Sequence, residues 1–166
     1  MEAYLEREFE ILNEYIGKDR SVKIIYRVRG SIPAEGLDRW FSLLEFPIKP
    51  FYMWVKGERT CGVYYELGEE TTTFYVKFRE GESTKARLEI GVKGTFFEKV
   101  LKEHEIMHSV SFKSRHVYLL SLPLNFSVKI LSPKGYSLRK TRKSLEFTWR
   151  KNKGVQRNLI IRLTKL

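Results

Sequence analysis

The chain has 166 residues and a mass of 19.7 kDa, with 42% hydrophobic residues, one cysteine and a formal net charge of +11. This composition excludes wholesale disorder and an internal disulfide, and a chain of this length can fold without one. No apolar run approaches the roughly 20 residues that span a bilayer, and the start Met1-Glu2-Ala3 is unlike a secretory signal. We therefore expect a soluble, cytoplasmic protein. Its many charged residues, with one Gln and four Asn, are typical of a thermostable protein.

The first third of the chain predicts a helix, a strand and a second helix. Over 3–16, apolar residues recur at helical spacing. The segment 21–29 alternates apolar and polar residues and is rich in β-branched side chains, as a half-buried strand is. A second helix is predicted from Ser31, with Pro33 in its first turn, to the break at Pro47. The apolar stripes of the two helices are Leu5, Phe9, Leu12 and Ile16, and Leu37, Trp40, Phe41 and Leu44.

The rest of the chain predicts mostly strands. Thr95 and Glu98 have the spacing of a capping box, which predicts a third helix over 95–104. Turn residues at 132–135 and 151–154 separate the last strands. The strands are expected at 51–56, 61–67, 72–79, 85–92, 106–113, 116–122, 125–131, 144–150 and 155–164.

These elements predict an α+β fold of antiparallel sheets with about three helices. The order strand, helix, four strands, helix over 21–104 resembles that of the TATA-box-binding protein fold, and basic strands follow it. The chain is expected to form a single compact domain, 1–166, with two possible lobes at 1–104 and 105–166.

Charge is unevenly distributed along the chain. Residues 1–124 carry 19 basic and 19 acidic side chains, whereas residues 125–166 carry 12 basic side chains and only Glu146 as an acid. If the strands at 144–150 and 155–164 pair, their polar sides form a cationic ribbon. Such a ribbon suits phosphate backbones, because each cationic contact releases counterions without reading sequence. The predicted phosphate contacts are Arg139, Lys140, Arg142, Lys143, Arg150, Lys151, Lys153 and Arg157.

The leading prediction is thus a non-enzymatic nucleic-acid-binding protein with low sequence specificity. DNA and RNA, single strand and duplex, all remain open, although Tyr136 or Trp149 would favour single strands if they faced outward. The alternative interpretation is that these residues form solvated strand edges that prevent aggregation. An acidic protein partner is also compatible with the charge.

One catalytic motif is present, and it points to a different class of protein. His104-Glu105-Ile106-Met107-His108 spells H-E-x-x-H and resembles the zinc site of the zincin metallopeptidases over five residues. The resemblance implies that His104 and His108 bind zinc and that Glu105 is the catalytic base. His116 is the available third histidine, but its spacing does not match the extended motif. The segment also alternates like a strand, which would hold His104 and His108 too far apart to share a metal.

A third interpretation is an interaction or ligand-binding scaffold without chemistry, for which a homodimer is one option. The predicted meander contains more aromatic residues than one core accommodates, so some are expected on a surface. They are Phe51, Tyr52, Trp54, Tyr64, Tyr65, Phe74, Tyr75 and Phe78. The sequence does not decide whether the protein is an enzyme, and it implies no cofactor other than zinc in the alternative reading.

Overall fold

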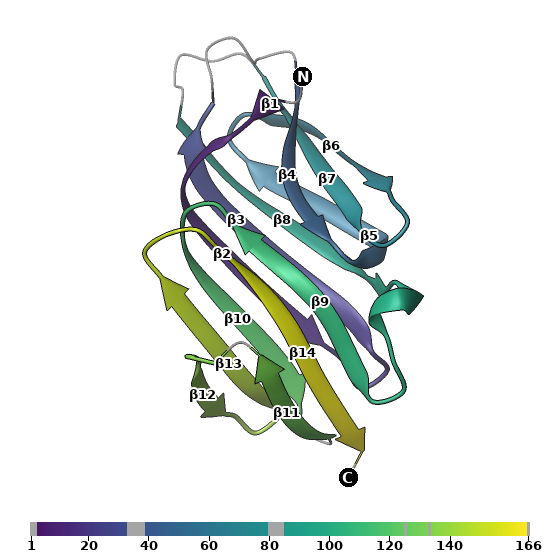
Figure 1. Ribbon diagram of the computed structural model, residues 1–166. Coiled ribbons are helices and arrows are strands. Elements are labelled where there is room, and N and C mark those ends of the chain that lie inside the picture. The colour runs from purple at the N-terminus through teal and green to yellow at the C-terminus, as the bar shows by residue number, and fades with distance from the viewer. Residues whose placement is uncertain (1–2, 33–38, 80–84, 125, 133, 166) are drawn as a thin grey trace.

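Strands dominate the architecture. The computed structural model describes residues 3–32, 39–79, 85–124, 126–132 and 134–165, which form fourteen strands and one three-residue 3-10 turn. The predicted α+β fold with three helices is therefore wrong, because the described part of the chain is nearly all β. The strands form a large sheet and two smaller ones, which cover one face of the large sheet (Figure 1).

The large sheet is twisted and runs the length of the molecule. All its neighbouring strands are antiparallel except β2 and β10, which are parallel. In spatial order its strands are β12 (Ser137–Lys140), β13 (Ser144–Lys151), β10 (Arg115–Pro123), β2 (Glu6–Ile16), β3 (Ser21–Ser31), β8 (Lys85–Phe96) and β5 (Ile48–Gly57). It therefore contains strands from both sides of residue 104, the boundary between the two lobes that the sequence suggests.

Two smaller sheets lie over the upper and lower halves of the large sheet (Figure 1). The four-stranded sheet consists of β1 (Ala3–Tyr4), β4 (Trp40–Phe46), β7 (Thr72–Phe78) and β6 (Thr60–Leu67). The three-stranded sheet consists of β11 (Phe126–Ser132), β14 (Val155–Lys165) and β9 (Glu105–Phe112). The core lies between these sheets and the large one, and alternate residues of each strand fill it, as with Val22, Ile24 and Tyr26 of β3.

The predicted first helix is the strand β2. Leu12 and Ile16, four residues apart, face the core in a strand as they would in a helix, which explains the wrong prediction. The inward position between them holds Glu14, and the inward position before Leu12 holds Glu10; both carboxylates are fully buried. Two carboxylates at core positions hid the alternation that would have indicated a strand.

The other two helices are also replaced. Residues 33–38 lie outside the described part of the chain, and the rest of the second predicted helix is β4, where Phe41 and Leu43 are fully buried. In place of the third, β8 continues to Phe96 and is followed only by the 3-10 turn η1 (Glu98–Val100). No side chain caps this turn, so the expected capping box does not form. The order that resembled the TATA-box-binding protein fold is therefore absent.

The predicted strands each overlap an observed one, from β3 through β14. Residue 125, the expected start of one of them, lies outside the described residues. Within the described part of the chain, no helix is long and apolar enough to cross a membrane.

Candidate functional site

The H-E-x-x-H segment lies on a strand, with only His104 outside it. His104 precedes β9 with 63% of its side chain exposed, whereas the side chain of His108 is 1% exposed. Four residues of strand separate their Cα atoms by about 13 Å, too far for ordinary shared coordination of one ion. Glu105 pairs instead with Arg162, 2.6 Å away, which lowers the pKa of Glu105. Among the described residues, no group of three or more His, Cys, Asp or Glu side chains could hold a metal.

His108 belongs to a buried polar chain in the core. Its Nε2 lies 3.1 Å from Oε2 of Glu14, and Oε1 of Glu14 accepts a hydrogen bond from the hydroxyl of Tyr118. Phe46 and Phe96 pack against the imidazole. Burial, and then the nearby Glu14 carboxylate, raise the pKa of Tyr118 well above its ordinary value. The hydroxyl therefore stays protonated and donates, which gives Glu14 a partner at each oxygen.

A second buried carboxylate, Glu10, has a fuller set of partners. Arg7 lies 3.0 Å from it, the Tyr26 hydroxyl donates to it, and the backbone N–H groups of Lys113 and Ser114 donate from 2.8 and 2.9 Å. Burial alone would raise the pKa of Glu10, but these hydrogen bonds and the guanidinium lower it below its ordinary value. Glu10 thus joins β2 to the turn before β10 as an ionised carboxylate.

The third histidine, His116, pairs with a buried arginine. Its Nδ1 donates to the carbonyl of Ser114 at 2.9 Å, so the other nitrogen, Nε2, accepts from Arg157 at 3.1 Å. Burial, and to a smaller extent Arg157, lower the pKa of His116. The ring also stacks on Phe112, 4.0 Å between centroids. His116 is therefore a neutral core residue, and Arg157, 6% exposed, is not placed to contact phosphates.

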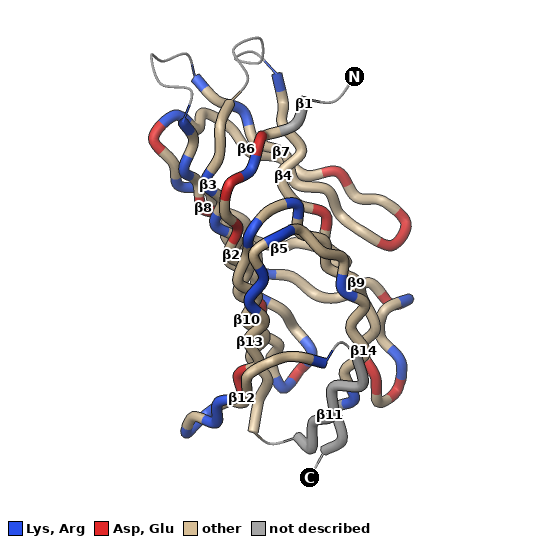
Figure 2. The backbone as a smooth tube through the Cα atoms, turned by 60° about the vertical axis from the view of Figure 1, so that its left-hand side comes forward, with Lys and Arg blue, Asp and Glu red and all other residues tan. Residues whose placement is uncertain are grey.

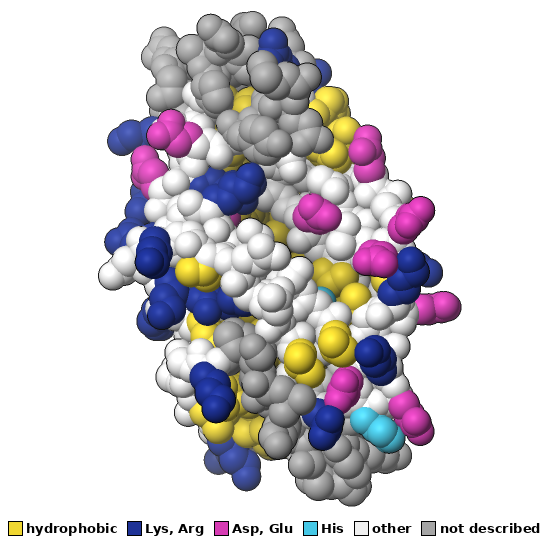
Figure 3. Space-filling view, in the orientation of Figure 1, with side chains coloured by type: hydrophobic (Ala, Val, Ile, Leu, Met, Phe, Trp, Pro, Cys, Tyr) yellow, Lys and Arg dark blue, Asp and Glu magenta, His cyan; other side chains and the backbone are white. Residues whose placement is uncertain are grey.

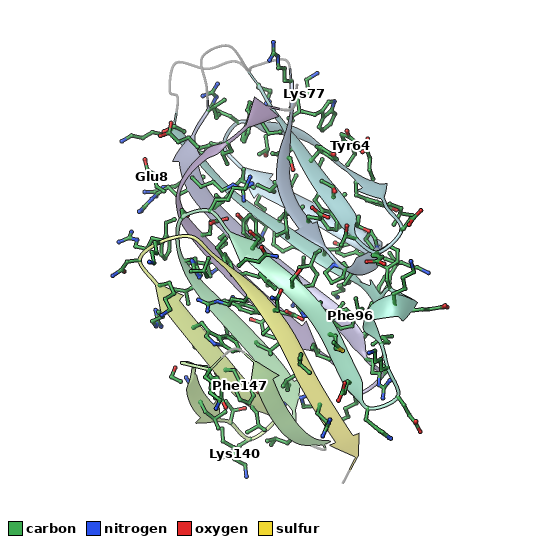
Figure 4. The ribbon with its side chains drawn as sticks, in the orientation of Figure 1. Glu8, Tyr64, Lys77, Phe96, Lys140 and Phe147 are labelled. Atoms are coloured by element: carbon green, nitrogen blue, oxygen red, sulfur yellow. The ribbon has the colours of Figure 1, made fainter. Side chains whose placement is uncertain are left out.

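The other basic residues of the last quarter do not form a ribbon. Strands β13 and β14 belong to different sheets, so the pairing on which the ribbon depended is absent. The alternation within β13 is as predicted, with Phe147 and Trp149 buried, and Tyr136 packs edge-on against both rings. Lys140 points away from the molecule at the lower end, whereas Phe147 lies inside (Figure 4).

The exposed cations of this region form two separate groups. Arg139, Lys140, Arg142 and Lys143 surround the β12–β13 hairpin, and Arg150, Lys151 and Lys153 lie at the opposite end of β13. The eight residues of β13 separate the groups by about 25 Å.

A larger basic surface, which sequence reasoning missed, covers the face of the large sheet that neither small sheet covers. We call it the open face. Figure 2 shows basic positions along β3 and β8, whose outward side chains contribute to this face. Its cations, all at least partly exposed, include Lys23, Arg27, Arg29, Lys56, Arg87, Lys93, Arg115, Arg139 and Arg150. The carboxylates on or beside it are Glu8, Glu58, Glu89 and Glu146.

Three of these cations have a carboxylate partner among the residues that the structure describes. Arg27 pairs with Glu89 at 3.1 Å, Arg29 with Glu8 at 3.6 Å and Arg139 with Glu146 at 4.0 Å, all between partly exposed groups. In the part of the chain that the structure describes, the other six have no carboxylate within ion-pair distance. They are Lys23, Lys56, Arg87, Lys93, Arg115 and Arg150.

Two pairs of like charge face each other directly across strands β3 and β8. Lys23 is the register partner of Lys93, and Arg29 is the partner of Arg87. Like charges at such positions destabilise a sheet unless an anion lies between them. The sequence signal was present in the alternation of 21–29, but only the pairing with β8 brings the second cation of each pair beside the first.

Aromatic rings lie among the cations of the open face. The guanidinium groups of Arg29 and Arg115 lie over the ring of Phe9, and Lys56 lies over Trp54. Lys23 and Lys93 lie in the same way over Tyr15 and Tyr52. A hollow of about 390 Å³ opens on this face; its lining includes Phe9, Ile11, Arg27, Arg29, Lys56 and Arg87.

Comparison with known proteins finds similarity of structure and not of sequence. No family model matches the chain, and no curated protein gives a significant match. An M1 zinc metallopeptidase from Deinococcus radiodurans superposes with a TM-score of 0.55 at 12% identity, covering 95% of this chain and 42% of that one. A mutant of that enzyme bound to a Tyr-Ser-Ala substrate gives 0.54 at 11% identity. Leukotriene A4 hydrolase from Saccharomyces cerevisiae gives 0.53 at 8% identity, over 93% of this chain and 29% of that one.

The fold is therefore one that metallopeptidases of this kind contain. The chain spans less than half the length of these structures, and at such identities the likeness concerns the fold.

Proposed function

We propose that the protein binds nucleic acid without catalysis, through the open face of the large sheet and not through the C-terminal strands alone. The observation that carries the proposal is the register of β3 and β8, which sets Lys23 opposite Lys93 and Arg29 opposite Arg87 on an exposed surface. A phosphate bound between two such cations removes their repulsion and releases counterions.

The mixture of cations and rings favours nucleic acid over other polyanions. Strands of one sheet are about 4.8 Å apart, so a chain that crosses them meets cations and rings in turn. Phosphates contact the lysines and arginines, and bases stack on exposed rings such as Tyr52, as single-stranded nucleic acids do on open sheets. The hollow lined by Phe9 and Arg87 offers room for a base beside a cation.

The test is fluorescence anisotropy with labelled 20-nucleotide single-stranded DNA, single-stranded RNA and duplex DNA over a series of salt concentrations. The variant Lys23→Gln/Arg87→Gln/Lys93→Gln removes three exposed charges from the open face. We expect it to flatten the slope of log affinity against log salt by about 2 units, because each lost phosphate contact contributes about 0.7–0.9.

The matched control is Lys140→Gln/Arg142→Gln/Lys143→Gln, which removes the same charge from exposed positions at the β12–β13 hairpin. It should change the slope by less than about one unit. The proposal is wrong if none of the three nucleic acids binds. It is also wrong if the hairpin variant loses as much slope as the open-face variant, which would instead support the C-terminal residues.

A further inference from the structure

A groove separates the two small sheets on the covered side of the large sheet. It has a volume of about 450 Å³ and lies between the ends of β4 and β7, the turn η1 and the strand β9. Figure 3 shows hydrophobic side chains in the hollow at the middle of this face. Its lining includes Glu45, Glu70 and Thr71 on one side and Met107, Ser109 and Ser111 on the other.

Both walls of the groove carry strand edges. β9 is the last strand of its sheet, and its other described neighbour is the single bridge from Ile106 to Leu101. Along 107–111 this edge therefore has no described strand beside it. On the other wall, β1 pairs with β4 only at Phe41 and Ser42, so the edge at 43–46 is likewise unpaired by any described strand. Unpaired edges present backbone N–H and C=O groups to an incoming strand.

A buried polar atom in the lining has no partner in the structure. His108 lines the groove, and its side chain is 1% exposed. Its Nε2–H is held by Glu14, whereas its Nδ1 is buried without a hydrogen bond. With the proton on Nε2, Nδ1 is an acceptor, and a buried acceptor left unpaired is costly. A ligand N–H would satisfy it.

The groove differs from the open face in the sign of its charge. Its lining holds two carboxylates, Glu45 and Glu70, and no Lys or Arg. Glu70 pairs with Lys99 at 3.2 Å, whereas Glu45 accepts a hydrogen bond from Thr71 and has no cationic partner among the described residues. The field at Glu45 therefore favours a cationic ligand.

We infer that this groove binds an extended peptide segment with basic side chains, which adds as a strand to the edge of β9. Backbone hydrogen bonds to β9 supply affinity, an N–H of the peptide reaches His108, and basic side chains approach Glu45 and Glu70. The site lies on the opposite side of the large sheet from the open face, so it does not depend on nucleic-acid binding.

The direct test uses a fluorescein-labelled, acetylated heptapeptide, Thr-Val-Lys-Val-Lys-Val-Thr, and measures anisotropy against protein concentration. We expect a Kd on the order of 10–100 µM, typical of short peptides that add to a sheet edge. The same peptide with Glu in place of Lys should bind at least about tenfold more weakly, a difference of about 1.4 kcal/mol. A peptide whose central Val is replaced by Pro should also lose binding, because proline lacks the N–H.

Variants of the lining residues test whether the peptide binds in the groove. Ser111→Arg fills an exposed lining position and should abolish binding, whereas Ser137→Arg makes the same change on the exposed strand β12 and should not. Glu45→Lys/Glu70→Lys should reverse the preference between the Lys and Glu peptides. Hydrogen exchange of the 107–111 amides should slow when the Lys peptide is bound. The inference is overturned by no saturable binding up to about 1 mM, by equal binding of the Pro peptide, or by Ser111→Arg that binds like the unmodified protein.

Discussion

The imidazole of His108 and the carboxylate of Glu14 are 3.1 Å apart in the core, although 94 positions separate them in the chain. The pair joins β9 of the three-stranded sheet to β2 of the large sheet, and the Tyr118 hydroxyl completes it. The histidine that most resembled a zinc ligand in the sequence is thus held by a carboxylate from another sheet. The pair is a structural link between the layers.

Removing Glu14 should therefore destabilise the fold. Glu14→Ala leaves the hydroxyl of Tyr118 and Nε2 of His108 buried without an acceptor. We expect the free energy of unfolding to fall by about 2–4 kcal/mol, measured by urea denaturation at pH 7. Glu8→Ala removes an exposed carboxylate from the same strand and should cost less than about 0.5 kcal/mol. Equal stability of the two variants would contradict the role given to Glu14.

The free energy of unfolding should decrease in two steps as the pH is lowered. The pKa of His116 is lowered in the folded state, so the unfolded state binds more protons and the folded state loses stability as pH falls below about 6.5. The pKa of Glu10 is also lowered, and the stability that its ionised form contributes is lost as pH falls below about 4.5. Urea denaturation between pH 3 and 8 measures both.

Two histidine variants test whether His116 causes the step at the higher pH. His116→Gln should remove the pH dependence near 6.5 and leave the lower step in place. His104→Gln changes an exposed histidine and should leave both steps unchanged. A His116→Gln protein that keeps the upper step would show that another group titrates there.

How far the sequence predicts this molecule depends on what the inward positions hold. In β3 the inward residues Val22, Ile24 and Tyr26 are apolar, and the strand was predicted from their alternation. In β2 two of the inward residues are Glu10 and Glu14, and several of their partners come from β9, the turn before β10, and β10 itself. No local pattern reveals such partners, so the sequence predicts a helix where the strand lies.

The candidate site follows the same logic. Local alternation correctly placed Phe147 and Trp149 in the core and Arg150 outside. It did not show that β13 and β14 enter different sheets, or that Lys23 meets Lys93 across β3 and β8. Clusters that depend on strand pairing over long sequence distances are set by topology, which residue spacing does not encode.

The ring of Trp54 lies on Gly91 in the neighbouring strand β8. A Cβ at Gly91 would lie 2.1 Å from Cε2 of the indole, so Gly91→Ala must displace the ring. We expect a loss of about 1–3 kcal/mol in the free energy of unfolding and a red shift of tryptophan fluorescence. Because the clash is with the indole, Gly91→Ala should cost much less in a Trp54→Ala background. The same cost in both backgrounds would place the conflict in the backbone.

Arg157 and Arg150 are both basic residues of the last quarter, and the structure separates their roles. Arg157 is buried against His116, and its guanidinium lies 6.0 Å from the ring of Trp149, so Arg157→Ala should lower the free energy of unfolding by about 2–3 kcal/mol. Arg157→Lys should recover little of this loss, because an ammonium does not reproduce the planar donor that reaches His116. Neither change should alter the salt dependence of nucleic-acid binding.

Arg150→Ala is the variant to compare with Arg157→Ala, because Arg150 is exposed at the edge of the open face. It should change the free energy of unfolding by less than about 0.5 kcal/mol and flatten the salt slope by up to about one unit. Urea denaturation and anisotropy on the same preparations measure both quantities. A reduced salt slope in Arg157→Ala protein that remains folded would place Arg157 at the phosphate and contradict its buried position. The expected result is that Arg157→Ala lowers only the stability and Arg150→Ala lowers only the salt slope.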